Sequence, residues 1–187
     1  MILSNETIEL RSYLIEKDNS ELKNIYLKWI SNTATIELIN SFSLYLKPDI
    51  NFINESFIRF TSAECQGFFI YHKELDQYLG TVKLDKIDLY RRSAEIGIMI
   101  GESSEYGKKI GTQSINLLLA YGFDALGLNR IWGGTSEYNY PMINLFKSLS
   151  FREEGRFKSA NYIAGEYSDN IYFCLLRDER GITHGTN

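Results

Sequence analysis

The chain has 187 residues, and its 20 basic and 24 acidic side chains give a net charge of -4. A chain of this length is expected to form a single domain, residues 1–187, that folds around its own core without disulfides or metals. The acidic balance argues against a nucleic-acid partner, because phosphate binding requires a basic face. Two cysteines and two histidines are too few for a disulfide framework or a zinc site.

Membrane association is also not expected. No apolar run approaches the ~20 residues that a membrane-spanning helix needs, and no apolar signal core follows the first methionine. The sequence therefore favours a cytoplasmic protein without a membrane partner.

The first third of the chain combines a strand with two helices. A strand is expected over Thr7 to Ile15, and a helix follows the candidate N-cap Asp18. The stretch from Ser31 to Lys47 has no clear period and is interpreted as a long connection. A second helix is expected from Asp49 to about Ala63. The apolar stripes of the two helices are Leu22, Ile25, Tyr26, Trp29 and Ile30, and Phe52, Ile53, Phe57 and Phe60.

The middle of the chain changes to a period of two. Gly67 to His72 and Tyr78 to Ile87 predict a hairpin that turns over Lys73 to Gln77. Ser93 to Gly101 is a third strand, nearly all apolar after Glu95, which is typical of a strand covered on both faces.

The last part alternates helices and strands. A polar stretch precedes a strong helix whose apolar side carries Ile115, Leu118, Leu119 and Phe123. A short strand (130–135), a short helix (141–149) and a final hairpin (151–163 and 167–177) follow, and the hairpin turns at Gly165. The tail from Gly181 is expected to fray. This order predicts a mixed α/β domain around one central sheet.

The most informative segment is YGKKIGT, Tyr106 to Thr112, between the third strand of this sheet and the strong helix. A helix that begins there directs its free N–H groups and positive dipole end toward an anion, and the glycines permit close approach. An ordinary solvated helix start is the alternative. Gly101 and Gly107 are one residue too far apart for a P-loop, and no GxGxxG triplet follows a strand, so both nucleotide motifs are excluded.

This segment resembles the acetyl-CoA pyrophosphate loop of the GNAT superfamily of N-acetyltransferases. The similar branch contains ribosomal-protein N-terminal, polyamine and amino-sugar acetyltransferases. Further matching segments occur in order along the chain. They are IELR (8–11), Trp29, RRSAE (91–95), YGF (121–123), LNR (128–130) and NYPMINLF (139–146). The resemblance implies an α+β fold with a mixed, mostly antiparallel sheet of about seven strands, splayed at the cofactor site and flanked by about four helices.

The resemblance also implies where acetyl-CoA would bind as the acyl donor. The pantetheine arm would lie beside one strand of the sheet, and the diphosphate would contact the loop before the helix. Asn139 would hold the cofactor near its thioester, or serve as a helix N-cap, or both. The glycines at 133 and 134 suit a close backbone approach at the splay. The implied cofactor residues are Ile98, Met99, Ile100, Tyr106, Gly107, Lys108, Lys109, Ile110, Gly111, Thr112, Asn139 and Phe146.

Three residues depart from the family pattern. Lys109 replaces the second glycine of the loop, and this adds a Cβ and makes positive φ costly. Phe146 replaces the usual tyrosine general acid, so Tyr138, Tyr140 or solvent would supply the proton to the departing thiolate. Ser150 stands where many relatives have a glycine.

Acetyl transfer requires a neutral amine, so a carboxylate acting directly or through a water is the expected base. Glu95 is the candidate, and its alternative role is a salt bridge to Arg91 or Arg92. Glu37 is a second, substrate-binding candidate in the irregular segment.

These observations favour direct acetyl transfer to a primary amine of a small molecule such as an amino sugar. A protein N-terminus, a polyamine, and a non-catalytic acyl-CoA-binding domain are the alternatives. A homodimer is left open, and no metal is expected.

Overall fold

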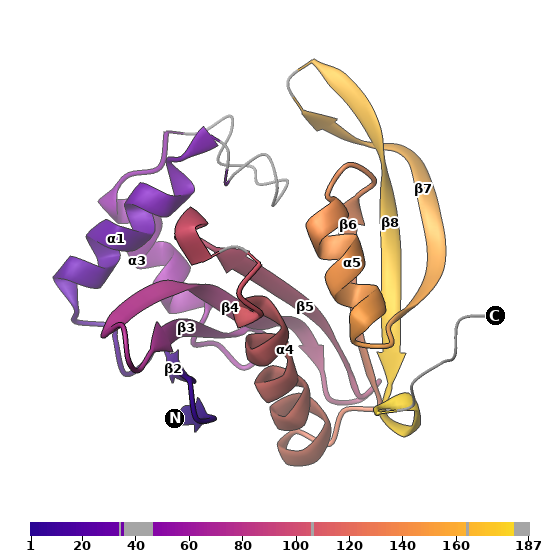
Figure 1. Ribbon diagram of the computed structural model, residues 1–187, viewed down its shortest axis with the longest axis horizontal. Helices are drawn as coiled ribbons and strands as arrows, with labels where there is room; N and C mark the ends of the chain where they lie inside the picture. Colours follow the sequence, from indigo (N-terminus) through magenta and orange to yellow (C-terminus); the bar gives the residue numbers. More distant parts are fainter. Residues whose placement is uncertain (34, 36–46, 106, 164, 182–187) are drawn as a thin grey trace.

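The structure is a computed structural model that describes residues 1–33, 35, 47–105, 107–163 and 165–181. Within these residues, eight strands form one sheet in the order β1-β2-β3-β4-β5-β6-β8-β7 (Figure 1). Every neighbouring pair is antiparallel except β5 and β6, which are parallel. The mixed, mostly antiparallel sheet is thereby confirmed. The additional strand is β1, a three-residue edge strand that pairs with β2.

The elements follow the expected order along the chain. They are β1 (Ile2–Ser4), β2 (Ile8–Ser12), α1 (Ser20–Ile30), α3 (Ile50–Arg59), β3 (Gln66–His72), β4 (Gln77–Asp88), β5 (Ser93–Ile100), α4 (Ile110–Ala120), β6 (Arg130–Ser136), α5 (Tyr140–Ser148), β7 (Arg152–Ile163) and β8 (Glu166–Leu176). No helix in these described ranges is long and apolar enough to cross a membrane.

Two helix boundaries differ from expectation. Asn19, rather than Asp18, caps α1, because its side chain accepts a hydrogen bond from the Leu22 amide at 3.0 Å. Asp49 caps α3 as predicted, but the helix ends at Arg59 rather than near Ala63. The carbonyl of Phe60 accepts a hydrogen bond from the Gly67 amide at 2.8 Å, and this bond turns the chain into β3.

The two faces of the sheet carry separate apolar clusters. On one face, α4 and α5 pack with residues such as Leu118 and Phe146 against the strands. On the other face, α1 and α3 bury Trp29, Ile53 and Phe57 together with Met99 of β5. The stripes expected for the two N-terminal helices are thus their buried faces, although Ile25, Phe52 and Phe60 are only partly buried.

The sheet opens between its two parallel strands. The pairing of β5 with β6 runs only from Ser93 opposite Arg130 to Glu95 opposite Trp132. Beyond this point, β6 and β8 diverge from β5 in Figure 1, with α5 packed beside them. The expected splay is confirmed. At its start a Cβ on Gly133 would lie 3.0 Å from the carbonyl oxygen of Ile96 in β5, so the expected close approach of another backbone is present, and it would lie 2.8 Å from Cζ of Phe146.

A tight contact joins α1 to the chain that leaves β5. Nε1 of Trp29 donates a hydrogen bond to Oε1 of Glu102 at 2.8 Å, and the indole is 2% exposed. The ring lies so close to Gly101 that a Cβ there would be 2.2 Å from Cδ2 of the indole. Real Cβ atoms do not occupy such positions, so the contact requires glycine.

Replacing this glycine should destabilise the protein. For Gly101→Ala we expect the free energy of unfolding to fall by about 1–3 kcal/mol, because the indole or the backbone must move. Urea unfolding followed by circular dichroism measures the change. Gly155→Ala is the matched control, because a Cβ there meets nothing within 4 Å. Equal midpoints for the two variants would contradict the contact.

Candidate active site

The loop before α4 contains two residues in the left-handed backbone region. Gly107 has φ 78°, and Lys109, the N-cap of α4, has φ 62° and ψ 9°. The lysine therefore keeps the left-handed conformation that is easiest for glycine, at a cost of about 1 kcal/mol. The departure at this position changes the side chain and leaves the turn intact. Ser150, the other substituted glycine position, also has a positive φ, at 65°.

The start of α4 has the features of an anion site. The amides of Ile110, Gly111 and Thr112 form its first turn, where N–H groups have no acceptor within the helix. Lys108 and Lys109 are exposed beside them. A Cβ on Gly107 would meet nothing within 4 Å, so one side of the loop is open. A diphosphate fits this arrangement. Tyr106, the other loop residue expected to bind it, lies outside the described residues.

The three β5 residues expected to contact the cofactor are divided between the two faces of the sheet. Ile98 and Ile100 pack on the α4 and α5 side, whereas Met99 belongs to the cluster beneath α1 and α3. Their shared feature is the backbone, which is no longer paired with β6 at this level. Every second N–H and C=O of this segment therefore faces the splay.

The expected site residues in and before α5 range from exposed to fully buried. Asn139 is the N-cap of the helix, since its Oδ1 accepts a hydrogen bond from the Met142 amide at 3.1 Å. Tyr138 and Tyr140, the expected proton donors, are 60% and 65% exposed. Phe146, also expected to contact the cofactor, lies in the interior. Its ring is fully buried, stacked on Phe173 at 5.0 Å between ring centres, and therefore belongs to the core.

Glu95 pairs with a lysine rather than with either expected arginine. Its Oε2 lies 2.7 Å from Nζ of Lys86, whereas Arg91 pairs with Asp88 and Nε of Arg92 donates to the carbonyl of Gly127. The β4 irregularity after Asp85 gives Lys86 a φ of 50° and brings its side chain to Glu95. The hydrogen bond to Glu95 raises the pKa of Lys86.

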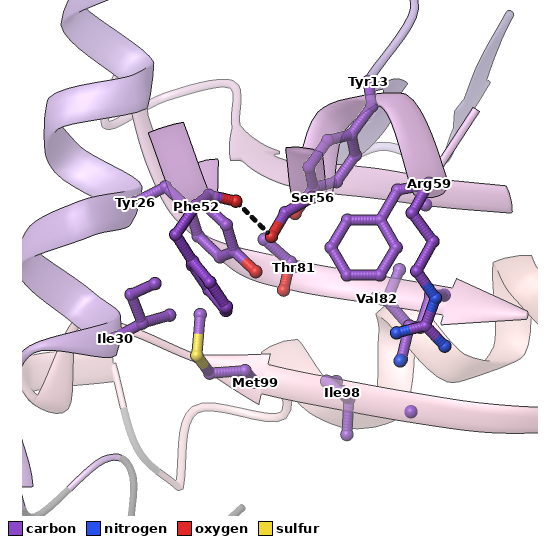
Figure 2. Close-up of a pocket in the computed structure, with 14 residues that line it drawn as sticks. Tyr13, Tyr26, Ile30, Phe52, Ser56, Arg59, Thr81, Val82, Ile98 and Met99 are labelled. Atoms are coloured by element: carbon purple, nitrogen blue, oxygen red, sulfur yellow. Dashed lines mark hydrogen bonds between the residues drawn. The ribbon is translucent and has the colours of Figure 1, made fainter. Parts of the chain in front are cut away.

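A pocket of about 480 Å³ lies between α1, α3 and strands β4 and β5 (Figure 2). Thr81–Lys83 of β4 and Gly97–Met99 of β5 line it on the sheet side. Its aromatic lining residues are Tyr13, Tyr26, Phe52 and Phe60. Glu95 is not among the lining residues. It is two positions from Gly97 on the same strand, and alternation places it on the same face.

Two buried tyrosines give this pocket hydroxyl groups that remain protonated. Burial raises the pKa of Tyr26 to about 12, and it raises the pKa of Tyr13 well above its usual value. Both hydroxyls can therefore donate hydrogen bonds at neutral pH. Sequence periodicity placed Tyr26 on a buried helix face but gave no sign that this face borders a cavity. Glu37, the expected substrate-binding residue, lies outside the described residues.

Two cations of the pocket share one carboxylate. Nη2 of Arg59 and Nζ of Lys83 lie 2.6 Å and 2.7 Å from Oδ2 of Asp85. Burial of this carboxyl opposes ionisation, but the hydrogen bond and charge of Lys83 prevail and lower its pKa to about 2. Sequence patterns do not indicate this cluster, because its members come from the end of α3 and from β4, which only the fold brings together.

Comparison with known proteins identifies the family. Residues 14–152 match the model described as the acetyltransferase (GNAT) domain. The chain is 37% identical over 117 residues to the uncharacterized N-acetyltransferase p20 of Bacillus licheniformis, covering 63% of this chain and 65% of that protein. It is 32% identical over 125 residues to spermidine N(1)-acetyltransferase of Escherichia coli (strain K12), covering 66% of this chain and 61% of that protein.

The fold is also that of solved acetyltransferase structures. The crystal structure of spermidine N-acetyltransferase from Vibrio cholerae in complex with CoA and spermine superposes with a TM-score of 0.81 at 21% identity, over 93% of this chain and 98% of that one. The matches to the two curated relatives span less than two thirds of the length of each. Because the family model covers well over half of the chain, the protein belongs to the GNAT acetyltransferase family.

Proposed function

We propose that the protein transfers the acetyl group of acetyl-CoA directly to a primary amine of a small molecule bound in the pocket. The supporting observation is that the splay, proposed to hold the donor, and the pocket, proposed to hold the amine, both adjoin β5. The pocket is bounded by Gly97–Met99 of β5, and the same residues follow the point at which β5 leaves β6. A thioester lying in the splay and an amine lying in the pocket would approach each other at this strand.

The residues proposed to hold the donor come from the loop and from β5. The first-turn amides of α4, with Lys108 and Lys109, would bind the diphosphate. The backbone of Ile98 to Ile100 would pair with the pantetheine amides, because β5 no longer pairs with β6 beyond Glu95. Asn139 would act at the other side of the splay in addition to capping α5.

The proposed chemistry is one displacement at the thioester. The amine nitrogen attacks the carbonyl carbon, a C–N bond forms, and the C–S bond breaks. The amine loses a proton to Glu95 through a water, because Glu95 does not line the pocket. The departing CoA thiolate gains a proton from solvent, Tyr138 or Tyr140. N–H groups of β5 that face the splay would stabilise the developing oxyanion. No acyl-enzyme forms on either cysteine, because burial raises the pKa of both thiols to about 12.

One experiment distinguishes the proposed function from its alternatives. Calorimetry measures the binding of acetyl-CoA, and a thiol reagent measures CoA release over a panel of small amines, polyamines and peptides. Binding with release on small amines supports the proposal. Release only on peptides supports an N-terminal acetyltransferase. Binding without release on any acceptor identifies a non-catalytic acyl-CoA-binding domain, and the absence of binding rejects both roles.

Charge reversal at the loop should weaken donor binding. Lys109→Glu places a carboxylate beside the diphosphate, so we expect the Kd for acetyl-CoA to rise by about tenfold or more. Isothermal titration calorimetry checks this value. Lys17→Glu, at an exposed lysine before α1, makes the same change in net charge away from the loop. Equal affinities for the two variants would reject the loop as the diphosphate site.

Removal of the proposed base should affect turnover more than binding. For Glu95→Gln we expect kcat to fall by about 100-fold, with little change in acetyl-CoA affinity. Lys86→Met is the matched control, because it breaks the same ion pair but keeps the carboxylate. A merely structural pair predicts equal losses in both variants. A base at Glu95 predicts that Lys86→Met retains most of the activity.

A further inference from the structure

The charge in the pocket is positive. Arg59 and Lys83 both line it, and Asp85 is the carboxylate that the described part of the chain places in ion-pair range of either. Asp85 is nearly fully buried, and its Oδ1 also accepts a hydrogen bond from the Lys86 amide at 2.9 Å. The depressed pKa of Asp85 keeps it ionised at neutral pH. Within the described residues, two cations therefore share one anion, and one positive charge of this cluster has no ion-pair partner.

Among the described residues, the guanidinium of Arg59 donates a hydrogen bond only to Asp85. Its side chain is 59% exposed, at the C-terminal end of α3, and Nη2 contacts Asp85. In Figure 2 it extends beside Val82 at the side of the pocket. A guanidinium has five N–H donors in a planar fork, which is suited to carboxylate and phosphate oxygens. Burial raises the pKa of Tyr26, and the positive charge of Arg59 opposes this effect, so the guanidinium influences groups inside the pocket.

The described pocket lining contains no Asp or Glu. Two carboxylates near the pocket, among the residues that the structure describes, are engaged elsewhere. Glu95 contacts Lys86, and Glu102 accepts a hydrogen bond from Trp29. The remaining polar lining is hydroxyl groups, and the one on Ser56 donates to the carbonyl of Phe52 at 2.8 Å. An acceptor with several ammonium groups would find cations here in place of counterions, and like charges at close range repel.

We propose that the acceptor carries an anionic group, a carboxylate or a phosphate, in addition to its primary amine, and that Arg59 and Lys83 bind this group. This inference rests on the proposed function and defines its substrate class. The aromatic lining residues would contact the apolar body of the acceptor. The tyrosine hydroxyls would donate hydrogen bonds to its polar groups. The amine would then be directed toward Gly97 and Met99, and the anion toward the end of α3.

Matched acceptors test the sign of the charge. One series keeps a four-carbon chain and changes only its far end: 4-aminobutanoate, butylamine and putrescine. A second pair, glucosamine 6-phosphate and glucosamine, keeps the amino sugar and adds a phosphate. We expect kcat/KM to be about tenfold higher for the anionic member of each series than for its neutral partner, and lowest for putrescine. The series that shows the larger preference distinguishes a carboxylate from a phosphate. The similarity to spermidine enzymes predicts the reverse order, and putrescine as the best acceptor would overturn the inference.

Loss of the guanidinium should remove this preference. For Arg59→Gln we expect kcat/KM to fall about tenfold for the anionic acceptors and to change little for butylamine, so that the two converge. Arg59→Lys should restore part of the difference. Arg180→Gln is the matched control, because Arg180 also pairs with one carboxylate, Asp124, after β8. A preference that survives in Arg59→Gln would reject the assignment.

The experiments distinguish a failure of the proposed function from a failure of the proposed anion site. If acetyl-CoA binds and CoA is released on amines without any charge preference, the function holds and the anion site is wrong. If no amine supports release, direct binding of glucosamine 6-phosphate and glucosamine to the wild type and to Arg59→Gln still measures the site. Tighter binding of the phosphate that is lost in Arg59→Gln supports it, and equal binding of the two sugars contradicts it.

Discussion

The short parallel contact between β5 and β6 governs the arrangement of the site. The two strands pair over only three positions, from Ser93 to Glu95 on β5, and then separate. A continuous parallel ladder would pair the backbone groups of the rest of β5, and no extended ligand could reach them. Because the ladder stops, this edge of β5 is no longer covered by β6, and the adjoining residues Gly97–Met99 also line the pocket.

Packing on both sides keeps this separation in place. Phe146 of α5 lies over Gly133 of β6 and is fully buried against Phe173, so α5, β6 and β8 form one unit. On the opposite side, Trp29 of α1 packs on Gly101 and donates a hydrogen bond to Glu102. This contact connects the helix that borders the pocket with the chain that leads into the loop before α4. Both contacts leave no room for a Cβ, and that explains why glycine occurs at these two positions.

Positive charge is concentrated in two regions of a protein whose net charge is negative. The overall charge is -4, yet lysines gather at the start of α4 and a shared-carboxylate cluster of Arg59, Lys83 and Asp85 borders the pocket. Both positive regions adjoin the splayed part of the sheet. The nearest carboxylates of this face, Asp85 and Glu95, are each held in ion pairs. The proposed reaction between an anionic donor and an anion-bearing amine fits this distribution.

From the sequence alone, local periodicity and glycine positions predicted the order of the elements and the position of the loop. The resemblance of the loop and of the segments that accompany it indicated the family and implied the splay of the sheet. The sequence could not determine which side chains meet across elements. The alternative role of Glu95 was a salt bridge to Arg91 or Arg92, but an irregularity in β4 brings Lys86 to it. Only tertiary packing shows that the ring of Phe146 lies in the core. The pocket and its cations were decided only by the fold, because the end of α3 must pack beside β4 before Arg59, Lys83 and Asp85 can act jointly.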